Sequence, residues 1–92
     1  MSNVKTSAYF DKRCELMQKR GYDIQDLKSV LKRLVEKKLL QSDRDHKWHG
    51  SYKKKRNIRE LHIKPDWLLL YYINHDIVYL VDTGSHSDFK IG

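Results

Sequence analysis

Two histidines, an aspartate and an arginine lie in two short segments of this sequence, and side chains of these types can perform acid–base chemistry on a phosphate. Arg59, His62 and Asp66 surround the junction of two apolar stretches, and His86 follows a third. We expect these stretches to be strands of one sheet, so that residues distant in sequence converge on one phosphate group. Imidazole suits proton transfer because its unperturbed pKa, about 6.5, lies near working pH. The pattern predicts a centre that could cleave RNA.

The length and charge of the chain limit its class and its partners. It has 92 residues, the size of one small domain. A formal net charge of +7 favours nucleic acid as partner, with acidic proteins and anionic lipids as alternatives. The single cysteine, Cys14, excludes an internal disulfide framework, and no apolar run approaches the roughly 20 residues of a membrane span. The first residues lack the apolar core of a signal peptide. We therefore expect a reduced, soluble, cytoplasmic protein.

The positive charge is concentrated between Asp43 and Lys64. This segment holds eight Lys and Arg residues and three acids, an excess of five (8 − 3). A run of charge is often only a solvated loop. Neighbouring histidines and aromatic rings favour a binding surface instead, because cations hold phosphates while rings stack on unpaired bases. The candidate binding residues are Lys53, Lys54, Lys55 and Arg56, close in sequence to His46, Trp48 and Tyr52.

The N-terminal part of the chain predicts two helices. Ser7 can cap a helix that runs to about Arg20 and ends at Gly21. Asp23 can cap a second helix, in which apolar residues at helical spacing form a buried stripe. The stripe consists of Leu27, Val30, Leu31, Leu34 and Val35. We expect this helix pair to back a sheet, with a short edge strand near 3–6.

The remainder predicts one long loop and three strands. Residues 39–56 are polar and basic without sustained periodicity, and long loops in compact domains tend to be functional. Strands are predicted near 58–64, 67–73 and 77–82, and their short connections predict an antiparallel meander in an α+β fold. The middle strand is apolar on both faces and is therefore central. Its core side chains are predicted to be Trp67, Leu69 and Tyr71, with Tyr72 on the opposite face.

Each candidate residue also has a purely structural explanation. His62 taken alone would more often be a hydrogen-bonded strand residue, and Asp66 is a common turn former. His86 is ambiguous in the same way. The pair His46 and His49 suggests a metal site, but the loop lacks cysteine or carboxylate ligands at the usual spacing, which favours no metal.

Four blocks of the sequence occur in a recognisable order. They are KRGYD at 19–23, RDH at 44–46, RELHIKPDWLLLY at 59–71 and TGSHSDF at 83–89. Together they resemble the RelE/ParE superfamily of bacterial toxins, and within it the YafQ type of mRNA interferase. The resemblance spans nearly the whole chain. It implies one toxin domain over residues 1–92, with two N-terminal helices packed on a twisted antiparallel sheet.

The resemblance also implies an activity and its partners. The expected activity is a ribosome-dependent endoribonuclease that cuts mRNA in the decoding site and belongs to a type II toxin–antitoxin system. A cognate antitoxin would hold it inactive, and operator DNA would be reached through the complex with that antitoxin. The family's catalytic positions fall on His46, His62, Asp66 and His86, and Phe89 resembles an aromatic that contacts RNA.

These positions suggest a reaction that needs no metal or other cofactor. A base removes the proton of a 2′-hydroxyl, which attacks the adjacent phosphate, and an acid protonates the departing 5′-oxygen. We assign Asp66 or His62 as the base and His86 as the acid. His46 and Arg59 would orient the phosphate and stabilise its developing charge.

The sequence departs from the family pattern at two places. Asp82 stands where an arginine is common before the Thr-Gly pair, so one of Lys53, Lys54, Lys55 or Arg56 would have to supply that charge. The segment from Gly50 to Ile58 is longer than usual, which bears on ribosome docking. The alternative function is a non-catalytic module that represses DNA with its antitoxin, or a toxin against another target such as gyrase. The complete histidine set favours the nuclease, because gyrase-directed relatives generally lack it.

Overall fold

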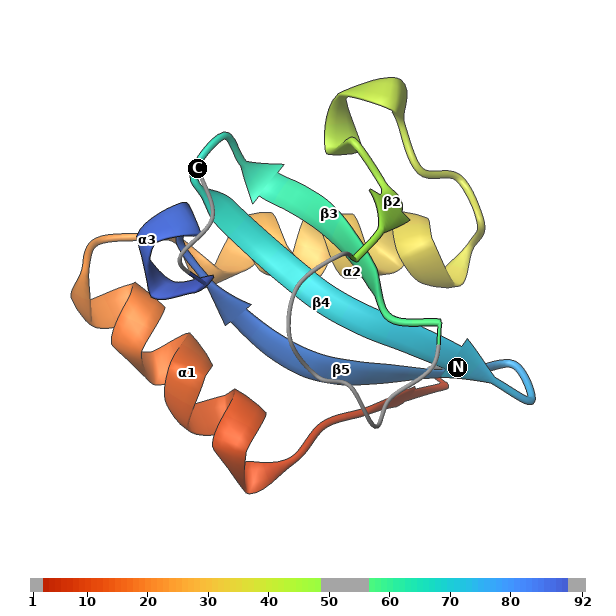
Figure 1. The fold of residues 1–92 in the computed structure, drawn as a ribbon, viewed down its shortest axis with the longest axis horizontal. Helices are drawn as coiled ribbons and strands as arrows, with labels where there is room; N and C mark the ends of the chain where they lie inside the picture. Colours follow the sequence, from red (N-terminus) through yellow and green to blue (C-terminus); the bar gives the residue numbers. More distant parts are fainter. Residues whose placement is uncertain (1–2, 49–56, 90–92) are drawn as a thin grey trace.

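The computed structural model describes residues 3–48 and 57–89, which form an α+β fold (Figure 1). The strands make one five-stranded sheet in the order β1-β5-β4-β3-β2. The elements in chain order are β1 (Val4–Lys5), α1 (Ala8–Lys19), α2 (Ile24–Val35), the 3-10 turn η1 (Gln41–Asp43), β2 (His46–Lys47), β3 (Arg59–Lys64), β4 (Trp67–Asn74), β5 (Ile77–Gly84) and α3 (His86–Phe89). The predicted fold class is therefore confirmed.

Both long helices begin at the predicted caps. The Ser7 hydroxyl accepts a hydrogen bond from the Phe10 N–H at 3.1 Å, and the Asp23 carboxylate accepts one from the Gln25 N–H at 2.9 Å. Such bonds satisfy amide groups that have no partner inside the first helical turn. After α1 the chain reverses at Gly21, whose φ of 101° lies in the region that favours glycine.

The sheet is an antiparallel meander of β3, β4 and β5 with a short strand added at each side. β2 pairs antiparallel with β3, placing His46 opposite Glu60. β1 runs parallel to β5, with Val4 opposite Val78, so the sheet is mixed rather than wholly antiparallel. The direction of a two-residue edge strand depends on how the chain crosses the sheet, which is not encoded in the strand's own sequence.

The segment predicted as a long loop contains more regular structure than expected. The prediction over 39–56 is wrong for η1 and β2, which are too short to show periodicity. The rest of that segment, 49–56, lies outside the described residues. β5 also runs two residues beyond the predicted strand end, and the short helix α3 that follows it was not predicted.

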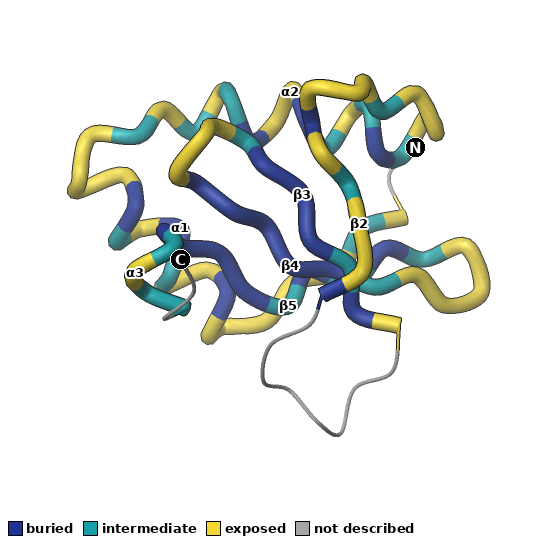
Figure 2. Tube along the Cα trace, turned by 45° about the horizontal axis from the view of Figure 1, so that its top comes forward, coloured by how far each residue is buried: buried dark blue, intermediate teal, exposed yellow. Residues whose placement is uncertain are grey.

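The two long helices, α1 and α2, pack on one face of the sheet. α1 lies along β5 and α2 lies behind β3 and β4 in Figure 1. The core between them includes Trp67, Leu69 and Tyr71, as predicted, while Tyr72 packs against a second apolar cluster with Leu70. The three central strands are the most buried part of the chain (Figure 2). None of the described helices has both the length and the apolar character needed to cross a membrane.

One buried hydroxyl joins two strands of the core. The Thr83 hydroxyl donates to the Leu68 carbonyl at 2.6 Å and accepts the Trp67 indole N–H at 2.8 Å. Thr83→Val should lower the free energy of unfolding by about 1–3 kcal/mol, because it leaves a buried indole N–H without an acceptor. Urea unfolding followed by circular dichroism measures this. Thr83→Ser keeps the hydroxyl, so an equal loss in that control would assign the effect to the missing methyl group instead.

Candidate active site

Three histidines from three elements form a row of rings. His62 on β3 lies in the middle, with ring centroids 6.3 Å from His46 on β2 and 5.6 Å from His86 at the start of α3. The sheet register explains the grouping. His62 lies opposite Leu68 of β4, and Leu68 lies opposite Gly84, the last residue of β5. His86 follows two residues later and therefore lies at the same end of the sheet as His62. The structure therefore brings together the three histidines that the sequence singled out.

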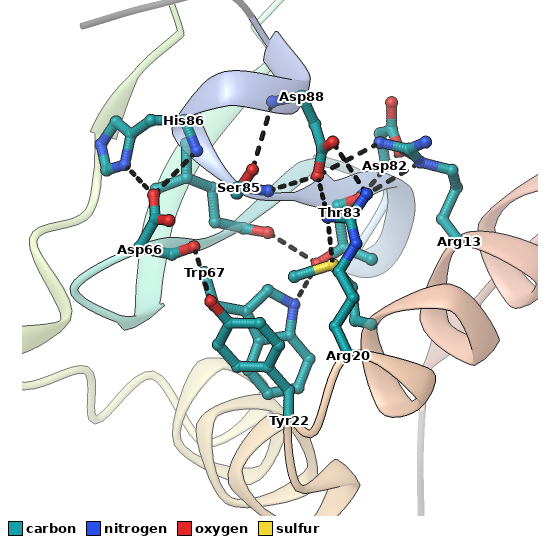
Figure 3. Close-up of polar contacts among 12 residues, drawn as sticks. Arg13, Arg20, Tyr22, Asp66, Trp67, Asp82, Thr83, Ser85, His86 and Asp88 are labelled. Carbon is teal, nitrogen blue, oxygen red and sulfur yellow. Dashed lines mark hydrogen bonds and ion pairs between the residues drawn. The ribbon is translucent and has the colours of Figure 1, made fainter.

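Asp66 fixes the orientation of His86. Its Oδ1 atom lies 2.7 Å from Nδ1 of the His86 ring and accepts the His86 backbone N–H at 3.0 Å, as Figure 3 shows. The backbone hydrogen bond, then the ring contact, lowers the pKa of Asp66 below its usual value. The ionised carboxylate accepts the Nδ1 proton, which leaves Nε2 as the ring nitrogen available to a substrate. Asp66 thus acts on His86 and is a poor proton acceptor itself.

His62 is the most enclosed of the three imidazoles. It is 8% exposed, and its Nδ1 atom is buried without a hydrogen-bond partner among the described residues. Burial lowers the pKa of His62 below 6.5, and the charges of Arg44 and the neighbouring imidazoles act in the same direction, against an opposing effect of Glu60. The ring is therefore neutral at neutral pH, which is the state that a general base requires.

His46 has a hydrogen-bond acceptor at each ring nitrogen. Its Nδ1 lies 2.8 Å from the Arg44 carbonyl oxygen, and its Nε2 lies 2.6 Å from Oε1 of Glu60. The two contacts fix the plane and direction of the ring. The buried Glu60 side chain thus holds the His46 ring from one side and the Arg44 carbonyl holds it from the other. The sequence analysis missed Glu60, although its position two residues before His62 places both on one face of a strand.

Arg59 is not part of this group. Its guanidinium is held by Asp45, with Nη2 2.7 Å and Nε 3.0 Å from Oδ2. The Tyr71 hydroxyl also donates to Asp45, and burial raises the pKa of Tyr71. Because side chains alternate along a strand, Arg59 and its neighbour Glu60 point to opposite faces. The arginine predicted to orient a phosphate instead forms an ion pair that ties the segment before β2 to β3.

The predicted RNA-contacting residues are only partly described. Phe89 packs edge-on against Trp48 with ring centroids 5.5 Å apart, in the apolar cluster on the face opposite the helices. The basic residues Lys53, Lys54, Lys55 and Arg56 lie outside the described residues, as does His49. An open hollow borders His46 and is lined by Leu39, Leu40, Gln41, Arg44 and Asp45. Within 3–48 and 57–89, no group of three or more histidine, cysteine or acidic side chains is arranged to hold a metal ion.

Asp82 is a buried structural carboxylate. Its Oδ1 lies 3.1 Å from Nε of Arg13, and it also accepts the Tyr9 hydroxyl at 3.4 Å and the Thr83 N–H at 2.7 Å. Arg13 and Tyr9 both belong to α1. The negative charge at this position is therefore neutralised within the fold, on the side of β5 that contacts α1 (Figure 3).

Comparison with known proteins gives one consistent family. Residues 2–90 match the family model described as bacterial toxin of type II toxin-antitoxin system, YafQ. The mRNA interferase toxin YafQ of Escherichia coli K12 is 30% identical over 87 residues, covering 92% of this chain and 91% of that protein.

Solved structures agree in fold. The toxin of the E. coli DinJ-YafQ complex has a TM-score of 0.80 at 29% identity, with 96% of this chain and 97% of that chain covered. A metal-bound toxin from Helicobacter pylori has a TM-score of 0.81 at 36% identity, with 96% and 98% covered. The similarity in both comparisons extends over almost the full chain.

Proposed function

Because this chain belongs to the YafQ family of type II toxin–antitoxin toxins, and is by that membership an mRNA interferase, an endoribonuclease, we propose that the row of His46, His62 and His86 is its catalytic centre. The observation that carries the proposal is the fixed geometry of these rings. A neutral, buried His62 lies 5.6 Å, centroid to centroid, from a His86 ring that Asp66 orients. A neutral base beside an oriented acid is the pair that RNA cleavage by acid–base catalysis requires.

The proposed reaction assigns one task to each ring. Neutral His62 removes the proton from a ribose 2′-hydroxyl, whose oxygen attacks the adjacent phosphorus. His86 donates the proton on Nε2 to the departing 5′-oxygen, leaving a 2′,3′-cyclic phosphate. His46, whose ring Glu60 holds beside His62, orients the phosphate. Of the two bases considered from sequence, His62 is favoured, because the low pKa of Asp66 and its bond to His86 leave it a positioning role.

The partners follow from charge and family. We propose that the substrate is mRNA in the ribosomal decoding site and that the net charge of +7 supports docking on rRNA. A cognate antitoxin is the proposed inhibitor, as a relative has been solved in the DinJ-YafQ complex. Operator DNA would be contacted through that complex, and a cytoplasmic location fits a protein acting on ribosomes.

Primer extension on mRNA from a translating extract tests the proposal. Reactions with and without ribosomes are compared for the wild-type chain and the His62→Ala/His86→Ala variant. Cuts that need ribosomes and vanish in the variant would support the function. Absence of cuts from folded, antitoxin-free wild-type protein would reject it in favour of a non-catalytic module that binds with its antitoxin to DNA.

The assignment of His62 as base makes a prediction about pH. A base must be deprotonated, and a lowered pKa keeps it deprotonated to lower pH. The midpoint of the acidic limb in the pH profile of kcat/KM should therefore lie below the usual histidine pKa of 6.5. Single-turnover cleavage of programmed ribosomes between about pH 5 and about pH 8 measures this limb. An acidic limb at or above the usual value would exclude His62 as the base.

A further inference from the structure

The short helix α3, which carries His86, is tied to the end of α1 by an arginine–carboxylate pair. Arg20 donates from Nη1 to Oδ2 of Asp88 at 2.6 Å and from Nη2 to Oδ1 at 3.1 Å. Two parallel bonds of this kind fix the carboxylate in direction as well as in distance. The pair lowers the pKa of Asp88 well below its usual range, so it stays ionised. Figure 3 shows Arg20 reaching from α1 to Asp88.

The same carboxylate closes the turn around His86. Asp88 Oδ2 accepts the Ser85 N–H at 2.8 Å, and the Ser85 hydroxyl accepts the Asp88 N–H at 3.2 Å. This reciprocal arrangement is a capping box, and the enclosed residues include His86. Asp88 therefore belongs both to the local turn that sets the His86 backbone and to the ion pair with α1.

α3 needs such contacts because it is too short to be stable alone. It has four residues, and a helix of one turn is unfavourable in water without tertiary support. The side chains of Arg13 and Asp88 pack closely against Gly84, just before α3. A Cβ atom at Gly84 would lie only 2.9 Å from Nη2 of Arg13 and 2.9 Å from Oδ2 of Asp88. The position of His86 therefore depends on a few polar anchors. Asp66 lies on one side, and on the other Asp88 pairs closely with Arg20 and more distantly, at 3.9 Å, with Arg13.

We propose that Arg20 is a positioning residue for catalysis, which through Asp88 holds α3 so that the His86 ring stays within reach of Asp66 and the phosphate. This rests on the proposed function of His86 as the acid. Arg20 contacts no member of the three-histidine row in the described structure, so its effect is on geometry. Small displacements of a catalytic group can lower turnover strongly without changing how substrate binds.

The test compares Arg20→Ala with Arg20→Lys and with Lys19→Ala, which removes the same charge from the preceding residue of α1. Arg20→Ala should lower kcat on programmed ribosomes by about 10- to 100-fold with KM almost unchanged, and Arg20→Lys should recover part of the loss. Lys19→Ala should retain wild-type kcat. In parallel, amide hydrogen exchange should become faster at His86, whose N–H is bonded to Asp66.

Several outcomes would overturn the proposal. They are a wild-type kcat in Arg20→Ala, an equal fall in Lys19→Ala, a loss confined to KM, or unchanged exchange at His86. Should Arg20→Ala fail to fold, Asp88→Asn serves instead, because its amide oxygen can still accept the Ser85 N–H while the ion pair is lost. If wild-type protein cuts no mRNA, the proposed function fails, and exchange at His86 alone decides whether Arg20 positions α3.

Discussion

Replacing His86 by alanine is expected to lower ribosome-dependent mRNA cleavage by about 10²- to 10⁴-fold, the usual range for a general acid, while antitoxin binding is retained. The cleavage rate falls because the leaving 5′-oxygen then has no proton donor. Antitoxin binding is retained because only the His86 ring is removed, and the Asp66 carboxylate that held it stays exposed at the surface. Cleavage rates on programmed ribosomes and titration with antitoxin measure the two properties separately.

Two further variants complete this experiment. Asp66→Asn should cost less than His86→Ala, because an amide oxygen can still accept the Nδ1 proton of His86. His75→Asn is the matched control, since His75 is an exposed histidine in the β4–β5 turn with a φ of 53° that asparagine tolerates. Growth arrest by His86→Ala as strong as that by the wild type would eliminate His86 as the acid.

Removing the buried charge of Asp82 is expected to cause the largest loss of stability. Asp82→Ala should lower the free energy of unfolding by about 3 kcal/mol, because it removes the buried carboxylate 3.1 Å from Arg13 and leaves that guanidinium only the more distant Asp88, at 3.9 Å. Asp82→Arg should be worse, since it places two cations together. It should also bring no gain in cleavage, because this position contacts α1. Urea unfolding and the ribosome assay measure these effects.

The double variant Arg13→Met/Asp82→Leu is the control for that prediction. Replacing both charges by apolar groups of similar size should restore much of the stability lost in Asp82→Ala, because neither charge of the pair is left alone and Asp88 keeps its pair with Arg20. If Asp82→Ala is as stable as the wild type, the Arg13–Asp82 pair does not contribute as its burial suggests.

The sequence predicts the parts of the fold that depend on local signals. Ser7 and Asp23 cap helices, Gly21 ends one, and the apolar runs give the three long strands. β2 and α3 escape prediction because two and four residues are too few for a periodic pattern. Their formation depends on pairing with β3 and on contacts to α1, which are tertiary.

In the candidate site, the sequence predicts which residues take part but not which residues they contact. The three histidines and Asp66 are predicted together, but the partner of each charged group is not. Arg59 is bonded to Asp45 rather than facing the histidines, and Asp82 is bonded to Arg13, which is 69 residues away in sequence. Such pairings depend on which faces of distant elements meet. The box formed by Ser85 and Asp88 carries a local signature and could have been found in the sequence.

The short strands at both margins of the sheet also bear on self-association. Strand edges with free backbone groups are templates on which other chains can add strands and aggregate. β2 covers part of the outer edge of β3, and β1 covers part of the outer edge of β5. Beyond β2, β3 has a register shift between His62 and Lys64, and a bulge and a lysine both disfavour strand addition. Beyond β1, the Arg13 side chain donates to the Thr83 carbonyl at 3.3 Å. Copies of this protein are thereby discouraged from extending one another's sheets.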